Sequence, residues 1–211
     1  MREIVFTIET YDKIAKKYEK KYGELSESEK PYLYAFYQLT ESEKPKILDA
    51  GCGTGRDLAY LENLSAELYG VDLSEGMLNL AKNKLKNTSL IKADIRKLPF
   101  PDNFFDGVLS IASLVHLPHK EKAKAINEFW RVLKPNGVLY ICIQNLLYPP
   151  RFKRCEKYKV KNSILYDGRY WYFPTKFSME DLLKREDFEI RFSPSFPSDE
   201  RLRFYCLKVL E

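Results

Sequence analysis

The chain has 211 residues, of which 45% are apolar, and a formal net charge of +5. This length predicts one domain with enough apolar side chains to bury a sizeable core. No apolar run reaches about 18 residues, so we expect no membrane-spanning helix, and so mild a charge does not by itself indicate a nucleic-acid-binding protein. Lysine and glutamate are abundant while glutamine occurs only twice, a composition that resembles that of thermophiles.

The cysteines and the N-terminal residues indicate a compartment. The four cysteines are far apart and form no C-x-x-C pair: Cys52, Cys142, Cys155 and Cys206. This spacing, together with only two histidines, argues against a metal site and a disulfide framework and fits a reducing cytosol. The opening "MREIVFTIETYDK" carries acids among its apolar residues and does not read as a signal peptide. We therefore expect a cytoplasmic protein without a metal.

Two helices are predicted before residue 45. Apolar residues recur at helical spacing over 9–22, with lysines on the outer face. A second helix is expected at 30–39, with Pro31 in its first turn. We interpret residues 1–44 as an N-terminal helical cover.

From residue 45 onward, strands and helices alternate. We predict strands at 46–50, 67–73, 89–94, 105–113 and 138–144, and helices at 55–64, 75–86 and 119–133. Ser74 is expected to cap the helix at 75–86, and the residues Pro135, Asn136 and Gly137 predict a turn before the fifth strand. Such alternation predicts a parallel sheet with helices on both faces.

The regular alternation of strands and helices is not predicted to continue after residue 144. Residues 145–177 are irregular but too aromatic to be a disordered linker. A helix is expected at 178–186, with Ser178 and Asp181 as a loose capping box, followed by antiparallel strands at 188–193 and 203–210. The predicted fold is a three-layer α/β sandwich with a mostly parallel seven-stranded sheet and an antiparallel final strand. Within this single domain, 45–144 forms the core, 145–177 an insert, and 178–211 the closing helix and strand pair.

Three glycines follow the first strand in "ILDAGCGTGRD": Gly51, Gly53 and Gly55. Ligands of parallel sheets bind at this end of a strand, and glycine lets the backbone take positive φ and approach a ligand closely. A P-loop would need Lys-Ser/Thr after the glycines, which is missing. A dinucleotide fingerprint that starts at Gly51 fails at Arg56. The loop therefore does not read as a phosphate cradle.

Acidic residues end the first three strands: Asp49, Asp72 and Asp94. The two oxygens of the Asp72 carboxylate can accept both hydroxyls of a ribose. The carboxylate of Asp94 could accept from an exocyclic amine such as that of adenine. Together the three acids predict a slot for a nucleoside whose other end is positively charged.

Four segments resemble, in order and spacing, the motifs of class I S-adenosylmethionine-dependent methyltransferases: "ILDAGCGTGRD", "GVDLSEGML", "KADIRKLPFPDNFFDGVLS" and "RVLKPNGVLYI". The resemblance is dense over 46–144 and looser beyond. Asn136 stands where the family usually has a second glycine, a position that asparagine tolerates. The resemblance implies a Rossmann-like fold, S-adenosylmethionine as cofactor and S-adenosylhomocysteine as product.

The resemblance also implies roles for individual residues. Asp49 would order the loop and the methionyl ammonium, Asp72 would bind the ribose hydroxyls, and Asp94 would take the adenine amine. The three glycines would let the backbone lie against the methionyl and ribose groups. Further expected contacts are Leu73 and Met77 with the adenine, the Ile95 backbone with its ring, the backbone near Ile111 and Ala112 with the methionyl group, and Tyr11 and Tyr18 from the cover. For the two tyrosines, packing between helices is an equal alternative.

Methyl transfer is an in-line displacement that positioning can largely accelerate. A base is needed only if the acceptor must lose a proton. His116, just past the fourth strand, is the candidate base. The alternative, that it shapes the pocket or bonds to the backbone, stays open.

The insert at 145–177 is expected to form the acceptor side. Tyr170, Trp171 and Tyr172 would be walls or a lid for a small organic acceptor, unless they form a small satellite core. The alternative acceptor is tRNA, bound through the basic residues Arg151, Lys153 and Arg154. "FDGVLSIASLVHL" also resembles methyltransferases of modified wobble uridines. A non-catalytic protein that binds the cofactor is the third possibility.

Overall fold

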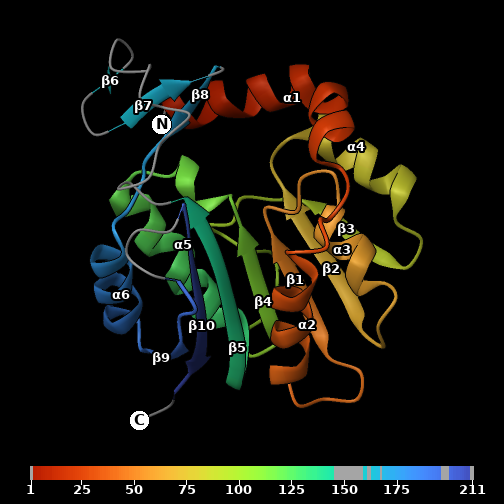
Figure 1. The fold of residues 1–211 in the computed structure, drawn as a ribbon, viewed down its shortest axis with the longest axis vertical. Helices are drawn as coiled ribbons and strands as arrows, with labels where there is room; N and C mark the ends of the chain where they lie inside the picture. The colour runs from red at the N-terminus through yellow and green to blue at the C-terminus, as the bar shows by residue number, and fades with distance from the viewer. Residues whose placement is uncertain (1, 145–158, 161–162, 167, 196–199, 210–211) are drawn as a thin grey trace.

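A seven-stranded sheet forms the centre of the computed structural model, which describes residues 2–144, 159–160, 163–166, 168–195 and 200–209 (Figure 1). The strand order is β3-β2-β1-β4-β5-β10-β9. β10 runs antiparallel to both neighbours and the other six strands are parallel. The predicted three-layer fold is confirmed. The strands are β1 Lys46–Ala50, β2 Glu67–Asp72, β3 Thr88–Lys92, β4 Phe105–Ile111, β5 Leu133–Gln144, β9 Phe188–Phe192 and β10 Arg201–Lys208.

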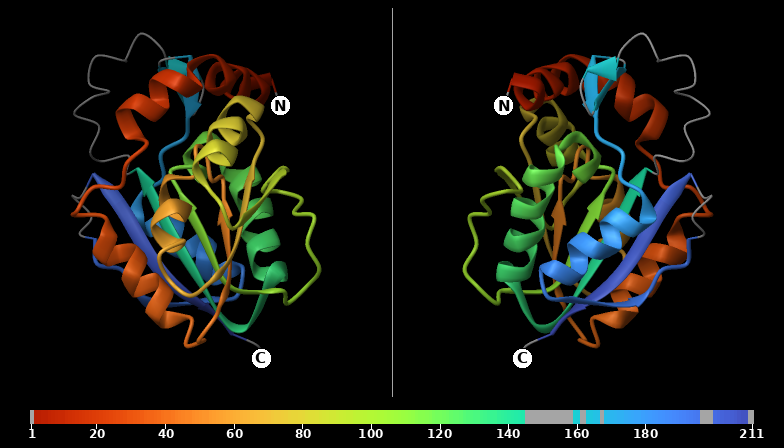
Figure 2. Two further views of the ribbon diagram at one scale, coloured as in Figure 1. Left: turned by 90° about the vertical axis from the view of Figure 1, so that its right-hand side faces the viewer. Right: turned by 90° about the vertical axis from the view of Figure 1, so that its left-hand side faces the viewer.

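Helices cover both faces of the sheet (Figure 2). α5 (His119–Val132) and α6 (Lys176–Arg185) pack on one face. α2 (Lys30–Leu39), α3 (Arg56–Leu61) and α4 (Glu75–Lys84) pack on the other. A strand buried on both faces needs an unbroken apolar run, and the run in β5 that predicted this strand supplies it.

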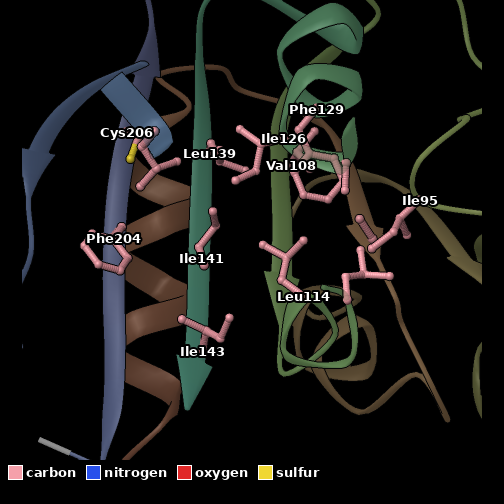
Figure 3. Close-up of a cluster of buried hydrophobic side chains, with 14 of the residues drawn as sticks. Ile95, Val108, Leu114, Ile126, Phe129, Leu139, Ile141, Ile143, Phe204 and Cys206 are labelled. Atoms are coloured by element: carbon pink, nitrogen blue, oxygen red, sulfur yellow. The ribbon is translucent and has the colours of Figure 1, made fainter. Parts of the chain in front are cut away.

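The core between the sheet and α5 is close-packed (Figure 3). Val108, Leu139, Ile141 and Phe204 come from three neighbouring strands and meet Phe129 of α5, and all five side chains are fully buried. Burying each such side chain stabilises the fold by about 1.5–3 kcal/mol. This core fixes the strand ends, where the loops of the site begin.

α1 (Arg2–Tyr22) lies across the ends of the central strands (Figure 1). It begins seven residues before the predicted start at 9, and Ile4 and Thr7 of this added part are buried. Asp12 fixes the helix to the start of α4, because its Oδ1 accepts from Ser74 Oγ at 2.6 Å and from the Gly76 N–H at 2.9 Å. Of the predicted cover, α1 lies over the site and the connection after it lines the larger cavity of the site through Ser26, Ser28 and Glu29, whereas α2 belongs to a sheet-covering layer.

A small second sheet lies beside α1 (Figure 1). Its strands are β6 Lys159–Val160, β7 Ser163–Tyr166 and β8 Arg169–Trp171. The Tyr170 N–H donates to Thr7 Oγ1 at 3.0 Å, and Thr10 Oγ1 donates to the Gly168 carbonyl at 2.6 Å. The buried Lys122 holds the next residues, donating to the carbonyls of Leu117 at 2.6 Å and Tyr172 at 2.7 Å. α1 and β8 therefore form one cover.

Two local predictions are wrong. The expected turn before the fifth strand is instead part of β5, which starts at Leu133 and shifts register against β4, with Asn136 at φ 60°. α6 begins at Lys176, not at 178. Its N-cap is Thr175, which forms a capping box with Ser178, the third residue of the helix. No helix in the described ranges is long and apolar enough to cross a membrane.

Candidate cofactor and acceptor site

Two adjoining cavities open at the carboxyl ends of the central strands, with volumes of about 700 and 130 Å³. Both are lined by Tyr11, Tyr18, Gly51, Gly53, Ile111 and Ala112. The smaller cavity is also lined by Asp72, Leu73, Met77, Asp94, Ile95 and His116. The chain thus brings together most of the residues that the sequence singled out.

The three glycines of the loop do three different things. All take positive φ: 93° at Gly51, 53° at Gly53 and 75° at Gly55. A Cβ on Gly51 would lie 2.4 Å from the Cβ of Ser113, so this glycine permits close packing. A Cβ on Gly53 would meet no atom within 4 Å and would point into open space. Gly55 packs beneath Leu85, caps α3 and lines neither cavity, so its contact with the ligand stays a prediction that this geometry does not favour.

The Asp72 carboxylate orders this loop. Its Oδ2 accepts from the Gly53 N–H at 2.9 Å, and its Oδ1 accepts from the Ser74 N–H at 2.8 Å. Burial raises the pKa of the carboxyl, and the backbone donors oppose that rise. Each oxygen keeps a further lone pair. Asp72 can therefore hold the loop and still accept the hydroxyls of a ribose.

Asp49 is a buried acid, and one of its carboxylate oxygens accepts no hydrogen bond from the described residues. The residue is 1% exposed, and its Oδ2 has no hydrogen-bond partner within the described part of the chain. Burial, together with the nearby Asp57 carboxylate, raises the pKa of Asp49 well above its usual range. A cationic group beside it would satisfy both its charge and its orphaned oxygen. The open space at Gly53 suits the methionyl end of S-adenosylmethionine, whereas Asp49 lines neither cavity, so its contact with the methionyl ammonium stays a prediction.

Asp94 already has a partner. Its carboxylate binds the fork of Arg96, with Oδ2 accepting from Nη2 at 2.6 Å and Oδ1 from Nε at 3.0 Å. The Arg96 N–H also donates to Oδ1, and these bonds hold the pKa of Asp94 below its ordinary value despite partial burial. Few lone pairs are left for an adenine amine, so that role stays a prediction.

His116 is held on both sides of its ring. Because a carbonyl only accepts, Nδ1 donates to the Tyr170 carbonyl at 2.8 Å, and Nε2 therefore accepts from the Tyr11 hydroxyl at 2.8 Å. Arg169 Nη1 donates to the same hydroxyl at 3.1 Å. Burial lowers the pKa of His116 to about 3. Its role as a base stays a prediction, and this geometry favours the alternative that the ring shapes the pocket.

This buried histidine predicts a pH dependence of stability. Below about pH 6.5, His116 binds a proton in the unfolded chain but stays neutral in the folded chain. The free energy of unfolding therefore decreases as the pH is lowered, by up to about 1.4 kcal/mol per pH unit. We expect His116→Asn to reduce this slope between pH 6.5 and 5, measured by urea unfolding. His119→Asn, at an exposed position that starts α5, should keep the parent slope. An unchanged slope for His116→Asn would contradict the burial of a neutral imidazole.

The acceptor side is only partly as expected. Trp171 lines the larger cavity, but Tyr170 and Tyr172 do not. Neighbouring residues of an extended segment point to opposite sides, so this geometry favours Trp171 as a wall, and the roles of Tyr170 and Tyr172 stay predictions. The basic residues Arg151, Lys153 and Arg154 lie outside the described residues. Among the residues that the structure describes, no group of three or more His, Cys, Asp or Glu side chains could hold a metal ion.

Three arginines of the larger cavity escaped the sequence analysis: Arg169, Arg201 and Arg203. Arg169 stands directly before the aromatic run that was singled out, so its position beside "YWYF" was the available signal. Arg203 is one basic residue in the apolar strand "RLRFYCLKVL", and only the pairing of β10 with β5 brings it to the cavity.

The fold and the cofactor slot define an enzyme that binds a nucleoside at the ends of a parallel sheet. A model of the methyltransferase domain matches residues 48–141. An uncharacterised protein of Methanocaldococcus jannaschii is 31% identical, over 90% of this chain and 78% of its own. The chain belongs to the class I S-adenosylmethionine-dependent methyltransferases and is a methyltransferase that uses this cofactor.

Two further relatives show how far the similarity extends. The PH0226 protein of Pyrococcus horikoshii has the same fold, with a TM-score of 0.74 and 28% identity over 86% of this chain and 88% of its own. The ubiquinone/menaquinone biosynthesis C-methyltransferase of Neisseria meningitidis is 36% identical over half of this chain. That match covers 45% of the enzyme's length, so the chain matches less than half of this relative.

Proposed function

We propose that this methyltransferase transfers the methyl group to a small organic acceptor held in the larger cavity. One observation carries the proposal: a cavity of about 700 Å³ continues from the smaller nucleoside cavity beneath α1 and β8, with room for the methionyl end of the cofactor at the glycine loop and for an acceptor beyond it. Pockets for small molecules range over about 300–1,000 Å³. Tyr11, Tyr18 and Trp171 supply aromatic walls.

The residues divide the work as follows. When bound, S-adenosylmethionine supplies a methyl group activated by a sulfonium. Asp49 and Asp72 hold the methionyl and ribose ends, and Leu73, Met77 and Ile95 enclose the adenine. Ile111 and Ala112, which line both cavities, flank the passage between cofactor and acceptor. These residues would hold an acceptor atom in line with the methyl group that the cofactor supplies, and this positioning is the chain's own contribution to the rate.

The segments would share this work. Residues 45–144 would form the cofactor core, α1 and the described strands β7 and β8 of the insert would enclose the acceptor, and α6, β9 and β10 would complete the fold. The three buried thiols that the structure describes, Cys52, Cys142 and Cys206, suit the cytosol as the place of action.

The test is a methyl-transfer assay with labelled cofactor against a metabolite extract and, separately, total RNA. We expect label in small molecules. Label in RNA alone would overturn the proposal in favour of the tRNA alternative. Asp72→Ala protein serves as the control for cofactor-dependent incorporation, since it should transfer almost no label to either pool.

A further inference from the structure

The larger cavity is strongly charged. Its basic side chains are Lys21, Arg56, Arg169, Arg201 and Arg203, and its acidic ones are Glu29, Asp57 and Glu200. Five positive charges thus face three negative ones. A bound cofactor adds to this excess, because the ammonium and carboxylate of its methionyl group cancel while its sulfonium remains.

Four of these charges neutralise one another. Arg56 pairs with Asp57 at 3.0 Å and lies 3.7 Å from the carboxylate of Glu29. Glu29 in turn pairs with Arg201. This network contains two cations and two anions and is balanced without a ligand. Among the described lining residues, Lys21 and Arg203 are basic residues outside this network.

Arg203, a residue of β10, is one of the positively charged residues of the larger cavity that lie outside this network. Its guanidinium lies 4.1 Å over the ring of Tyr32, and it has no ion pair with any carboxylate that the structure describes. Stacking occupies the face of a guanidinium and leaves the N–H donors at its edge available for an oxyanion. Lys21 lines the same cavity and packs over Tyr22 at 4.9 Å, also without an ion pair to a described acid. Among the described residues that line this cavity, Glu200 is the one acid outside the network.

Strand register relates Arg203 to the reaction centre. Ile111 of β4 is paired with Cys142 of β5, and Cys142 with Arg203 of β10. Strands are spaced about 4.8 Å apart, so the backbones of Ile111 and Arg203 lie about 10 Å apart. All three residues line the larger cavity. A molecule the size of a small aromatic acid can bridge this distance.

We propose that the methyl acceptor is a small organic oxyanion whose carboxylate or phosphate binds Arg203, assisted by Lys21, while its methylated atom faces Ile111. This inference rests on the proposed function. The acceptor's negative charge balances the excess of the cavity, and the fork of Arg203 orients the acceptor toward Ile111. The cofactor's own carboxylate is a competing occupant of Arg203, which the variants below distinguish.

The first experiment separates the metabolite extract into anionic, neutral and cationic pools by ion exchange before the labelled assay. We expect incorporation in the anionic pool, and prior phosphatase treatment distinguishes phosphates, which lose it, from carboxylates, which keep it. Incorporation in the neutral or cationic pool would overturn the inference while the proposed function stands. Incorporation in RNA alone, or in no pool, would overturn the proposed function and the inference with it.

The second experiment compares Arg203→Gln with Arg185→Gln, using the acceptor purified from the active pool. Arg185 is an exposed residue of α6 paired with Asp181, far from either cavity, and is the matched control. Loss of a charged hydrogen bond should raise the acceptor KM of Arg203→Gln by about 10- to 100-fold. Its Kd for S-adenosylhomocysteine should match that of the parent. A weakened cofactor Kd with an unchanged acceptor KM would assign Arg203 to the cofactor and overturn the proposal.

Discussion

Asp72→Ala protein is expected to bind S-adenosylmethionine about a hundredfold more weakly than the parent, which corresponds to roughly 2.7 kcal/mol. The Asp72 carboxylate holds the N–H groups of Gly53 and Ser74, and its remaining lone pairs face the cavity that we assign to the nucleoside. Hydrogen bonds to a charged group contribute about 1.5–3 kcal/mol each. Isothermal titration with the cofactor, below the unfolding temperature of both proteins, measures the loss.

Asp106→Ala is the matched control. Asp106 also accepts from a backbone N–H, that of Lys46 at 2.8 Å, and from Lys134 Nζ at 2.7 Å. It lies at the amino end of β4, beside the start of β1 and at the end of the sheet opposite the site. This variant should lower the unfolding temperature and leave cofactor affinity unchanged. A folded Asp72→Ala protein that binds the cofactor as tightly as the parent would remove Asp72 from the site.

The order of the core strands and helices could be predicted because each signal is local. Apolar runs, the cap at Ser74 and the glycines after β1 all lie within a few residues of the feature that they predict. Ser74 Oγ does accept from the Met77 N–H. The acids at the strand ends could also be predicted to lie near one another, because parallel strands bring successive loops to one edge of the sheet.

The cover could not be predicted in the same way. β6, β7 and β8 have two to four residues each, too few for a period to appear. The start of α1 is held by Thr7 and Thr10, polar residues that bond to β8 rather than join an apolar face. Contacts between residues about 160 positions apart leave no pattern in either segment.

The contacts of the site's polar residues were hidden for a related reason. His116 looked like a base because its position beside β4 was visible, but its partners Tyr11 and Tyr170 belong to distant segments. These partners turn a titratable ring into a neutral link between the core and its cover. The glycine loop shows the same limit, since three glycines with similar φ have different neighbours. Their neighbours determine what a substitution at each would do.

We expect Gly53→Ala to lose cofactor affinity while it remains folded. Its φ of 53° lies in the left-handed region, which costs alanine about 1–2 kcal/mol. No protein atom lies within 4 Å of the added Cβ, so no clash increases that cost. Because Gly53 lines both cavities, the methyl group occupies space that the cofactor needs. Affinity should fall by about a hundredfold or more, measured by isothermal titration.

Gly55→Ala should behave in the opposite way and is the matched partner of this test. Its φ is 75°, and its Cβ would lie 2.7 Å from Leu85 Cδ1 and 3.3 Å from the Cβ of Ala81. Strain and overpacking together should cost about 2–4 kcal/mol of unfolding free energy. Cofactor affinity of the folded protein should stay within about threefold of the parent, since Gly55 packs against α4 and not against the ligand. If Gly55→Ala lost affinity and kept its stability, or Gly53→Ala did the reverse, the assignment of Gly53 as the bare backbone that faces the cofactor would be wrong.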